Sequence, residues 1–436
     1  MTRRTFLVLL VLGAGSLPGR AAAQGTTDSL TLAEAVHLVL QSHPLLQEAA
    51  DQIAAAEARV EQRRSGYYPV IDGTGSYSHV APVPSITLGG DSAFNLYPSN
   101  NYDANVALRQ LVYDFGRRGA GVDLARAGVE GATEDRAVTE SNLAYRTIDT
   151  FNAILFLRQS LAIQDQTIAA LDEHLVAIRT RVEAGTATDF DALTTEVRLA
   201  TARSRRSDVA NRLQKATVAL RDLAGLPPDR PLALRGALEV TAVDLDRDAR
   251  VTFALANRPE VRRARTVENA AALQGRVAAL GNRPQLDVGV MVGVKNGYIP
   301  NLNTIKANYL AGVQVSVPIF DGYLTRNAVE ESRARQEAAA ARTAAIARDV
   351  ATEVEQAISD VRTSLEKTET TTLQVRQAEQ ALEMANTRYA AGVVTNLDVL
   401  DATTALAEAR LLDVEAHLQF ALSRSALERA VGSRAW

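Results

Sequence analysis

The sequence contains no cysteine among its 436 residues, which excludes disulfide bonds, thiol chemistry and lipid attachment through an N-terminal cysteine. Aromatic residues make up only 5% of the chain, which is few for the core of an enzyme of this length. The five histidines lack metal-ligand spacing, and no phosphate-binding loop or serine-nucleophile motif occurs. The net charge of −4 does not favour nucleic acid as a partner. We therefore expect no enzyme activity, no cofactor, no metal and no nucleic acid.

Long hydrophobic runs are also missing, apart from a short one near the N-terminus. Residues 1–23 combine two arginines with an apolar run from Phe6 to Leu12 and with three alanines at 21–23. This pattern is typical of a secretory signal peptide, because the run is shorter than the roughly 20 residues of a membrane-spanning helix. No later run is long enough for such a helix. If the mature chain crosses a membrane, it must do so with strands.

The mature chain contains two repeats at an offset of 207 residues, as for Gly185 and Gly392. Residues 114–225 and 321–432 align without a gap, and only the loop between the first two predicted strands differs in length. Internal repeats of this kind indicate duplicated structural units. We therefore expect a first repeat, a linker or equatorial segment and a second repeat, at residues 24–225, 226–258 and 259–436.

Each repeat is predicted to contain a short helix, two strands and a helical hairpin, with the hairpins at 117–225 and 324–432. The first helix of each hairpin, about 117–183 and 325–390, contains no proline. At 1.5 Å per residue, about 67 residues form a rod of roughly 100 Å, a length typical of coiled coils or tubular helical assemblies. The second helix is about half as long. The uncovered half needs either the short helices after Pro44 and Pro259 or another copy of the chain.

Four segments carry strand patterns. In residues 286–294 every even position is Leu or Val, which is strict alternation over the length of a transmembrane barrel strand. A half-buried soluble sheet would alternate in the same way. Four strands cannot close a barrel, so spanning strands would need several copies of the chain. The strands are expected at about 67–80, 103–116, 285–295 and 308–320, and the fold class is mostly α with a membrane β-barrel part.

The order of these features resembles the TolC-type outer-membrane efflux channels. The resemblance rests on the opening residues 30–35 followed by His43-Pro44, on the Tyr-Asp-Phe-Gly and Phe-Asp-Gly ends of the strand pairs, on the two glycine-containing tips and on residues 397–404. It implies a homotrimer with a twelve-stranded β-barrel in Gram-negative outer-membrane lipid and a periplasmic α-helical barrel. It further implies a passive exit duct for tripartite efflux or type I secretion, which docks an inner-membrane pump through a periplasmic adaptor.

The hairpin tips carry the candidate functional residues. Thr188 with Asp191, and Thr395 with Asp398, form T-x-x-D capping patterns, which suffice to explain Asp191. Asp401 has a threonine at the equivalent position of the first repeat, so capping does not require an acid there. Three copies would gather the carboxylates of Asp398 and Asp401 around one axis, and in the resembled family the matching residues line the periplasmic aperture. We predict this pore aperture, with helix capping and a solvated face as the alternative.

Tyr389 matches a family tyrosine that helps to hold the closed tip together. The family's basic partner is absent, because Val394 occupies its position. Tyr389 is therefore a candidate gate latch whose partner differs. Gly185 and Gly392 are expected to end the preceding helices in a left-handed conformation. With Asp191, these glycines mark the tip turns, where the family meets its adaptor.

The alternative function is that of a periplasmic adaptor, which also carries a long helical hairpin. An adaptor has one hairpin flanked by sheet domains in nested order. This sequence instead predicts two hairpins and strands of membrane length. A structural coiled coil would leave those strands unexplained. The comparison favours the channel.

Overall fold

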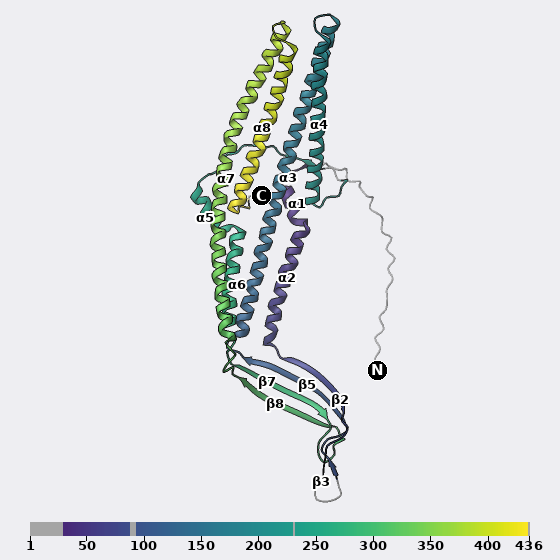
Figure 1. Ribbon diagram of the computed structural model, residues 1–436, viewed down its shortest axis with the longest axis vertical. Helices are drawn as coiled ribbons and strands as arrows, with labels where there is room; N and C mark the ends of the chain where they lie inside the picture. The colour runs from purple at the N-terminus through teal and green to yellow at the C-terminus, as the bar shows by residue number, and fades with distance from the viewer. Residues whose placement is uncertain (1–28, 88–92, 230–231, 435–436) are drawn as a thin grey trace, which may run out of the picture.

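The computed structural model describes residues 29–87, 93–229 and 232–434, and the predicted signal peptide at 1–23 lies outside them. Figure 1 shows an elongated molecule with two helical hairpins at one end and a twisted sheet at the other. Among the described residues, none of the helices has both the length and the apolar character to cross a membrane.

Two very long helices run along most of the molecule. Helix α3 (Arg117–Glu183) and helix α7 (Leu324–Ala390) have 67 residues each. They pair with α4 (Asp189–Leu223) and α8 (Asn396–Val431), which are about half as long. These bounds agree within one residue with the rods expected from the absence of proline.

The short helices after the two prolines cover the other half of the rods. Helix α2 (Pro44–Arg64) packs against α3, and α6 (Pro259–Ala279) packs against both α7 and α3 (Figure 1). Each begins with proline at its first position, where the missing N–H costs no helical hydrogen bond. The sequence left two candidates to cover this half of the long helices, the short helices or another copy of the chain. Within one chain, the short helices cover it.

A four-stranded antiparallel sheet joins the two repeats, in the order β2-β5-β7-β8. The central pairing of β5 and β7 places Val106 opposite Val292 and Leu108 opposite Val290, so apolar side chains share one face. The first strand loop is longer because it carries a small hairpin of two strands. The strands are β2 (Val70–His79), β5 (Asn100–Tyr113), β7 (Gln285–Lys295) and β8 (Lys306–Ser316), with β3 (Ser85–Thr87) and β4 (Ala93–Asn95) in the loop hairpin.

Two strands end earlier than the alternation suggested. Strand β5 ends before Asp114, whose carboxylate accepts hydrogen bonds from the backbone amides of Gly116 and Arg118 and so opens α3. Strand β8 ends at Ser316, shortly before Pro318, which has no N–H for a sheet ladder. Local capping and proline chemistry therefore override the apolar pattern at these two ends.

The segment 226–258 is more structured than the linker expected there. It contains β6 (Ala233–Leu234), which pairs in parallel with β1 (Ser29–Leu30), and helix α5 (Arg247–Asn257). The Asp246 side chain caps α5 by accepting from the amides of Asp248 and Ala249. Like α1 (Leu32–Ser42), α5 directly precedes a proline-initiated helix. The position of α5 before α6 in the second repeat thus matches that of α1 before α2 in the first.

The core lies at mid-length, where α1 and α5 meet the long helices. Phe151 and Ile154 of α3 are 1% and 0% exposed in one buried cluster, and Phe420 of α8 is 1% exposed in a second. A further cluster, with Leu171 and Leu400, joins the two hairpins nearer the tips. Burial of such side chains is the main source of stability. The bases of both hairpins are thus held at mid-length, far from the tips.

The end of α8 offers a paired test of this packing. Gly432 has φ = +76°, and a Cβ there would lie 2.9 Å from Cα of Arg258. We expect Gly432→Ala to lower the free energy of unfolding by ~1–3 kcal/mol, because left-handed strain and backbone overlap act together. Gly128→Ala in α3, where a Cβ meets nothing within 4 Å, should raise it by ~0.5–1 kcal/mol. Calorimetric unfolding of both variants checks the opposite signs, and equal shifts would contradict the assignment.

Candidate functional site at the helical tips

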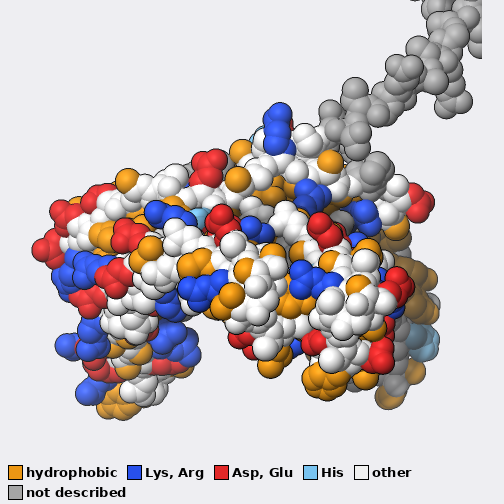
Figure 2. Space-filling view, turned by 90° about the horizontal axis from the view of Figure 1, so that it is seen from above, with side chains coloured by type: hydrophobic (Ala, Val, Ile, Leu, Met, Phe, Trp, Pro, Cys, Tyr) orange, Lys and Arg blue, Asp and Glu red, His pale blue; other side chains and the backbone are white. Residues whose placement is uncertain are grey.

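The two hairpin tips lie at the end of the molecule remote from the sheet (Figure 1). Helices α4 and α8 contact each other, so the tips of the two repeats are neighbours within one chain. Figure 2 looks down on this end and shows acidic and basic side chains interspersed over it. Because the two tips are neighbours, charged residues of the first hairpin can pair with charged residues of the second.

Both tip turns have the left-handed glycine expected from the sequence. Gly185 has φ = +72° and Gly392 has φ = +71°. The amide of Thr186 donates to the carbonyl of Arg181 at 2.8 Å, and that of Val393 donates to the carbonyl of Arg388 at 2.9 Å. A Cβ at either glycine would meet nothing within 4 Å, so the backbone conformation alone selects glycine.

Asp191 and Asp398 cap the helices that follow. The Oδ2 atom of Asp191 accepts hydrogen bonds from the amide and hydroxyl of Thr188, at 3.0 and 2.7 Å. The Oδ2 atom of Asp398 accepts the same pair from Thr395, at 2.8 and 2.6 Å. In each case the threonine hydroxyl is the main cause that lowers the pKa of the carboxyl below its ordinary value. Both aspartates are therefore ionised at neutral pH.

Asp401 is paired, whereas Asp398 is not. The Oδ1 atom of Asp401 lies 3.0 Å from Nη2 of Arg198 in α4, and the two side chains are 59% and 41% exposed. Asp398 forms no ion pair with any described residue. The second tip therefore presents one carboxylate without an ion pair, Asp398, beside one that ties the tip to the first hairpin, Asp401.

Tyr389 contacts the first hairpin through its ring. The guanidinium carbon of Arg181 lies 4.5 Å from the ring centroid, and the His174 ring lies 5.7 Å away, tilted by 57°. The Tyr389 hydroxyl makes no hydrogen bond to any described residue. An arginine of the other tip thus supplies the positive charge that Val394 does not.

Asn396 is the buried link between the tips, with 4% of its surface exposed. Its Oδ1 lies 2.7 Å from Nε2 of His174, and its Nδ2 donates to the carbonyl of Asp191 at 3.1 Å and to the hydroxyl of Thr195 at 3.3 Å. Both ends of its amide are therefore bound to the first hairpin, as a buried polar group requires.

These contacts form one set, which we call the tip network: His174, Arg181, Arg198, Tyr389, Asn396 and Asp401. Sequence reasoning singled out Tyr389 and Asp401 from this set but missed their partners. It noted His174 only as one of five histidines without metal-ligand spacing. The sequence held one clue to the partner of Asp401. Its counterpart in the first repeat is Thr194, and Arg198 lies one helical turn after that threonine. The other partners are brought together only by the packing of the two hairpins.

Comparison with known proteins gives matches over nearly the whole chain. A family model described as outer membrane efflux protein matches residues 35–226 and 251–433. Protein CyaE of Bordetella pertussis is 28% identical over 323 residues, which cover 71% of this chain and 65% of CyaE. Outer membrane efflux protein BepC of Brucella suis is 24% identical over 437 residues, which cover 97% of this chain and 90% of BepC.

The fold is also that of a solved structure. The outer membrane protein VceC of Vibrio cholerae superposes with a TM-score of 0.78 at 19% identity, over 92% of this chain and 96% of VceC. The predicted fold class, mostly helical with a strand part, is thereby confirmed. The two matched ranges of the family model begin within α1 and within α5.

These matches decide between the two functions considered from the sequence. Both hairpins and both strand pairs lie inside the matched ranges, so the periplasmic adaptor alternative is wrong. The matched proteins are transport channels of the outer membrane rather than enzymes, and the resemblance noted from the sequence is confirmed. The chain belongs to the outer membrane efflux protein family.

Proposed function

We propose that three copies of this chain form a passive exit duct, with a shared twelve-stranded barrel in the outer membrane and a helical tunnel in the periplasm. The observation that carries this proposal is the open four-stranded sheet, whose outer strands β2 and β8 each pair on one side only. Its apolar face is exposed, with Tyr309, Val313 and Val315 at 84%, 69% and 64%. An open edge is not viable in lipid, so copies must join β8 to β2 around a ring.

At the other end, the aperture would be formed by Asp398 and Asp401 of the three copies. The two residues are three apart on α8, one helical turn, so their side chains lie on one face. Ionised carboxylates around a narrow axis attract cations and repel anions. Within one chain, the hydrogen bonds from Thr395 lower the pKa of Asp398, which favours its charged form at neutral pH.

The tip network would hold the aperture closed. Each of its contacts joins the second hairpin to the first, so the second tip cannot move outward without breaking them. A periplasmic adaptor, carrying an inner-membrane pump, would bind around the turns at Gly185, Asp191 and Gly392 and supply the energy for opening. The duct itself would catalyse no reaction and would need no cofactor.

The assembly and the pore are tested together with the mature chain. We expect a heat-sensitive trimer in the outer-membrane fraction and a small, cation-selective single-channel conductance in a planar bilayer. A soluble periplasmic monomer without conductance would overturn the proposal.

Tyr389 is expected to act through its ring rather than through its hydroxyl. Tyr389→Phe keeps the face that Arg181 and His174 contact, so the conductance should remain that of the wild type. Tyr389→Ala removes the face and should raise the open probability severalfold in single-channel recordings. A change in the phenylalanine variant as large as that in the alanine variant would assign the latch to the hydroxyl instead.

A further inference from the structure

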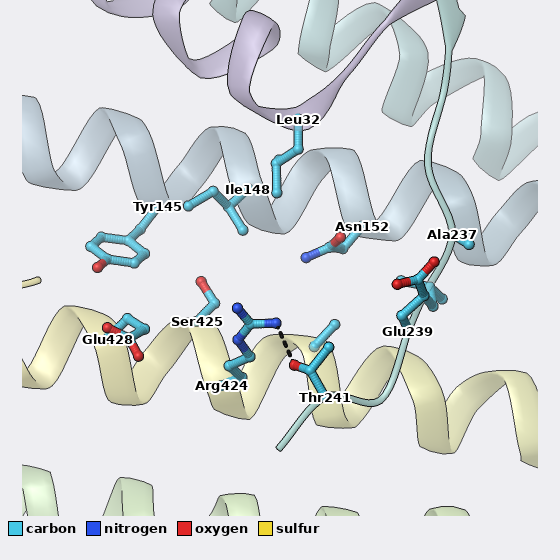
Figure 3. Close-up of a pocket in the computed structure, with 12 residues that line it drawn as sticks. Leu32, Tyr145, Ile148, Asn152, Ala237, Glu239, Thr241, Arg424, Ser425 and Glu428 are labelled. Carbon is cyan, nitrogen blue, oxygen red and sulfur yellow. Dashed lines mark hydrogen bonds between the residues drawn. The ribbon is translucent and has the colours of Figure 1, made fainter. Parts of the chain in front are cut away.

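A pocket lies at mid-length between α3 and α8, where α1 and the segment 237–241 cross them (Figure 3). Its walls come from both repeats: Leu32 from α1, Ile148 and Asn152 from α3, and Arg424 from α8. It contains no residue of the tip network. A molecule held here would touch α3 and α8 at once.

Asn152 is a polar residue of this pocket whose side chain has no hydrogen-bond partner among the described residues. Its side chain is 8% exposed, and Figure 3 shows its amide directed into the pocket. The amide makes no hydrogen bond to any of the described residues. Both amide atoms remain accessible from the pocket, where a ligand could replace water as their hydrogen-bond partner. Its direction indicates a ligand that completes its hydrogen bonds.

Arg424 faces the same space from the opposite helix. Its Nη1 donates to the hydroxyl of Thr241 at 2.8 Å, and its guanidinium pairs with no carboxylate among the described residues. Glu428, which also lines the pocket, lies instead 3.6 Å from Arg250. The remaining N–H groups of Arg424, an exposed residue, make no hydrogen bond to a described residue. The Asn152 amide lines the same pocket. Two such donor groups match the oxygens of a carboxylate.

The rest of the lining limits the shape and charge of the ligand. Leu32, Ile148 and Leu238 provide an apolar wall. Glu239 and Glu428 lie on either side of Arg424 in Figure 3. These acids would repel a dianion, whereas a single carboxylate can be neutralised by Arg424.

We propose that this pocket binds a small amphipathic monocarboxylate, with its carboxylate on Arg424 and Asn152 and its apolar chain against Leu32 and Ile148. Such a ligand would brace α3 against α8 at the base of the hairpins. This site goes beyond the exit-duct function, since binding needs neither the aperture nor a partner protein.

Binding is tested with hexanoate on the purified mature chain in its native assembly, by calorimetry and thermal unfolding. We expect hexanoate to bind and to raise the unfolding temperature, because a ligand that binds only the folded state stabilises it. Hexylammonium and hexyl phosphate, which have the same chain length, should do neither. No response to hexanoate at millimolar concentration would overturn the proposal, as would equal responses to all three compounds. A stronger response to hexylammonium would assign the site to the glutamates instead.

Variants locate the site. Arg424→Gln and Asn152→Leu should each weaken hexanoate binding by about tenfold or more, because each removes donors to the carboxylate. An unchanged unfolding temperature of Asn152→Leu without ligand would show that this variant is folded. Loss of binding in this variant would then not come from unfolding. Arg205→Gln, at an exposed position of α4, is the control and should bind as the wild type does. Unchanged binding in both pocket variants would overturn the proposal.

Discussion

Replacing Asp398 and Asp401 together by asparagine should lower the cation-to-anion permeability ratio of the pore by about tenfold, because six carboxylates leave one narrow ring in a trimer. The single variants should differ. Asp398 has no ionic partner among the residues that the structure describes, so Asp398→Asn removes an unpaired charge, whereas Asp401→Asn also releases Arg198. We therefore expect Asp401→Asn to change both selectivity and open probability, and Asp398→Asn to change mainly selectivity. Reversal potentials in a salt gradient measure the selectivity, and single-channel records measure the open probability.

The matched control for this pair is Glu366→Gln with Glu369→Gln. These two exposed carboxylates are also three residues apart on a long helix, in α7, but they lie away from the tip. Their replacement removes the same number of charges and should leave the permeability ratio unchanged. An equal fall in both double variants would mean that selectivity follows the total charge of the duct. The aperture would then lie elsewhere.

The proposed ring of carboxylates also predicts that cation selectivity depends on pH. The pKa of Asp398 is lowered by hydrogen bonds from Thr395, so its carboxylate stays ionised below the ordinary range for aspartate. In the proposed trimer the neighbouring carboxylates raise this pKa while Thr395 lowers it, and cation selectivity should be lost as the pH falls through the resulting pKa. Thr395→Val removes the hydroxyl that is the main cause, so selectivity should be lost at a higher pH than in the wild type. Coinciding pH profiles of the two proteins would separate Asp398 from the selectivity.

Reversing the charge of Arg198 should open the tip. Arg198→Glu places a like charge opposite Asp401 in place of an ion pair, at a cost of roughly 1 kcal/mol per protomer for exposed groups. If three protomers open together, roughly 3 kcal/mol corresponds to about a hundredfold change in the ratio of open to closed channels. Single-channel open probability measures this ratio. The effect should shrink at high salt, because exposed charges are screened.

Exchanging the charges of Arg198 and Asp401 tests whether their ion pair holds the tip closed. Arg198→Asp combined with Asp401→Arg restores an attractive pair and should return the open probability towards the wild-type value. Arg205→Glu makes the same charge change at an exposed α4 residue and should have no effect on gating. If the exchanged double variant stays open while Arg198→Glu is open, the ion pair is not what holds the tip. The Asn396 and Tyr389 contacts would then carry the closure.

The candidate site shows where sequence reasoning succeeds and where it stops. The glycines and the capping aspartates were predictable, because a helix end is decided by residues within one turn of it. The partners of Tyr389 and Asp401 were not, because Arg181 and Arg198 lie about 200 residues earlier in the chain. In the family that the sequence resembles, a basic residue occupies the position of Val394. The fold supplies that charge from the other hairpin.

The sequence alone determined the helices, the duplication and the alternating strands of this protein, because helix length, repeat offset and strand period are local patterns. It missed α5, an eleven-residue helix whose stability comes from packing on α7 and α8. Only the tertiary structure decided which helices cover the long rods and which charges meet at the tip. It alone also brought Asn152 and Arg424 to one pocket. The reason is that these contacts join the two repeats, and a repeat aligned with its copy carries no information on how the two pack together.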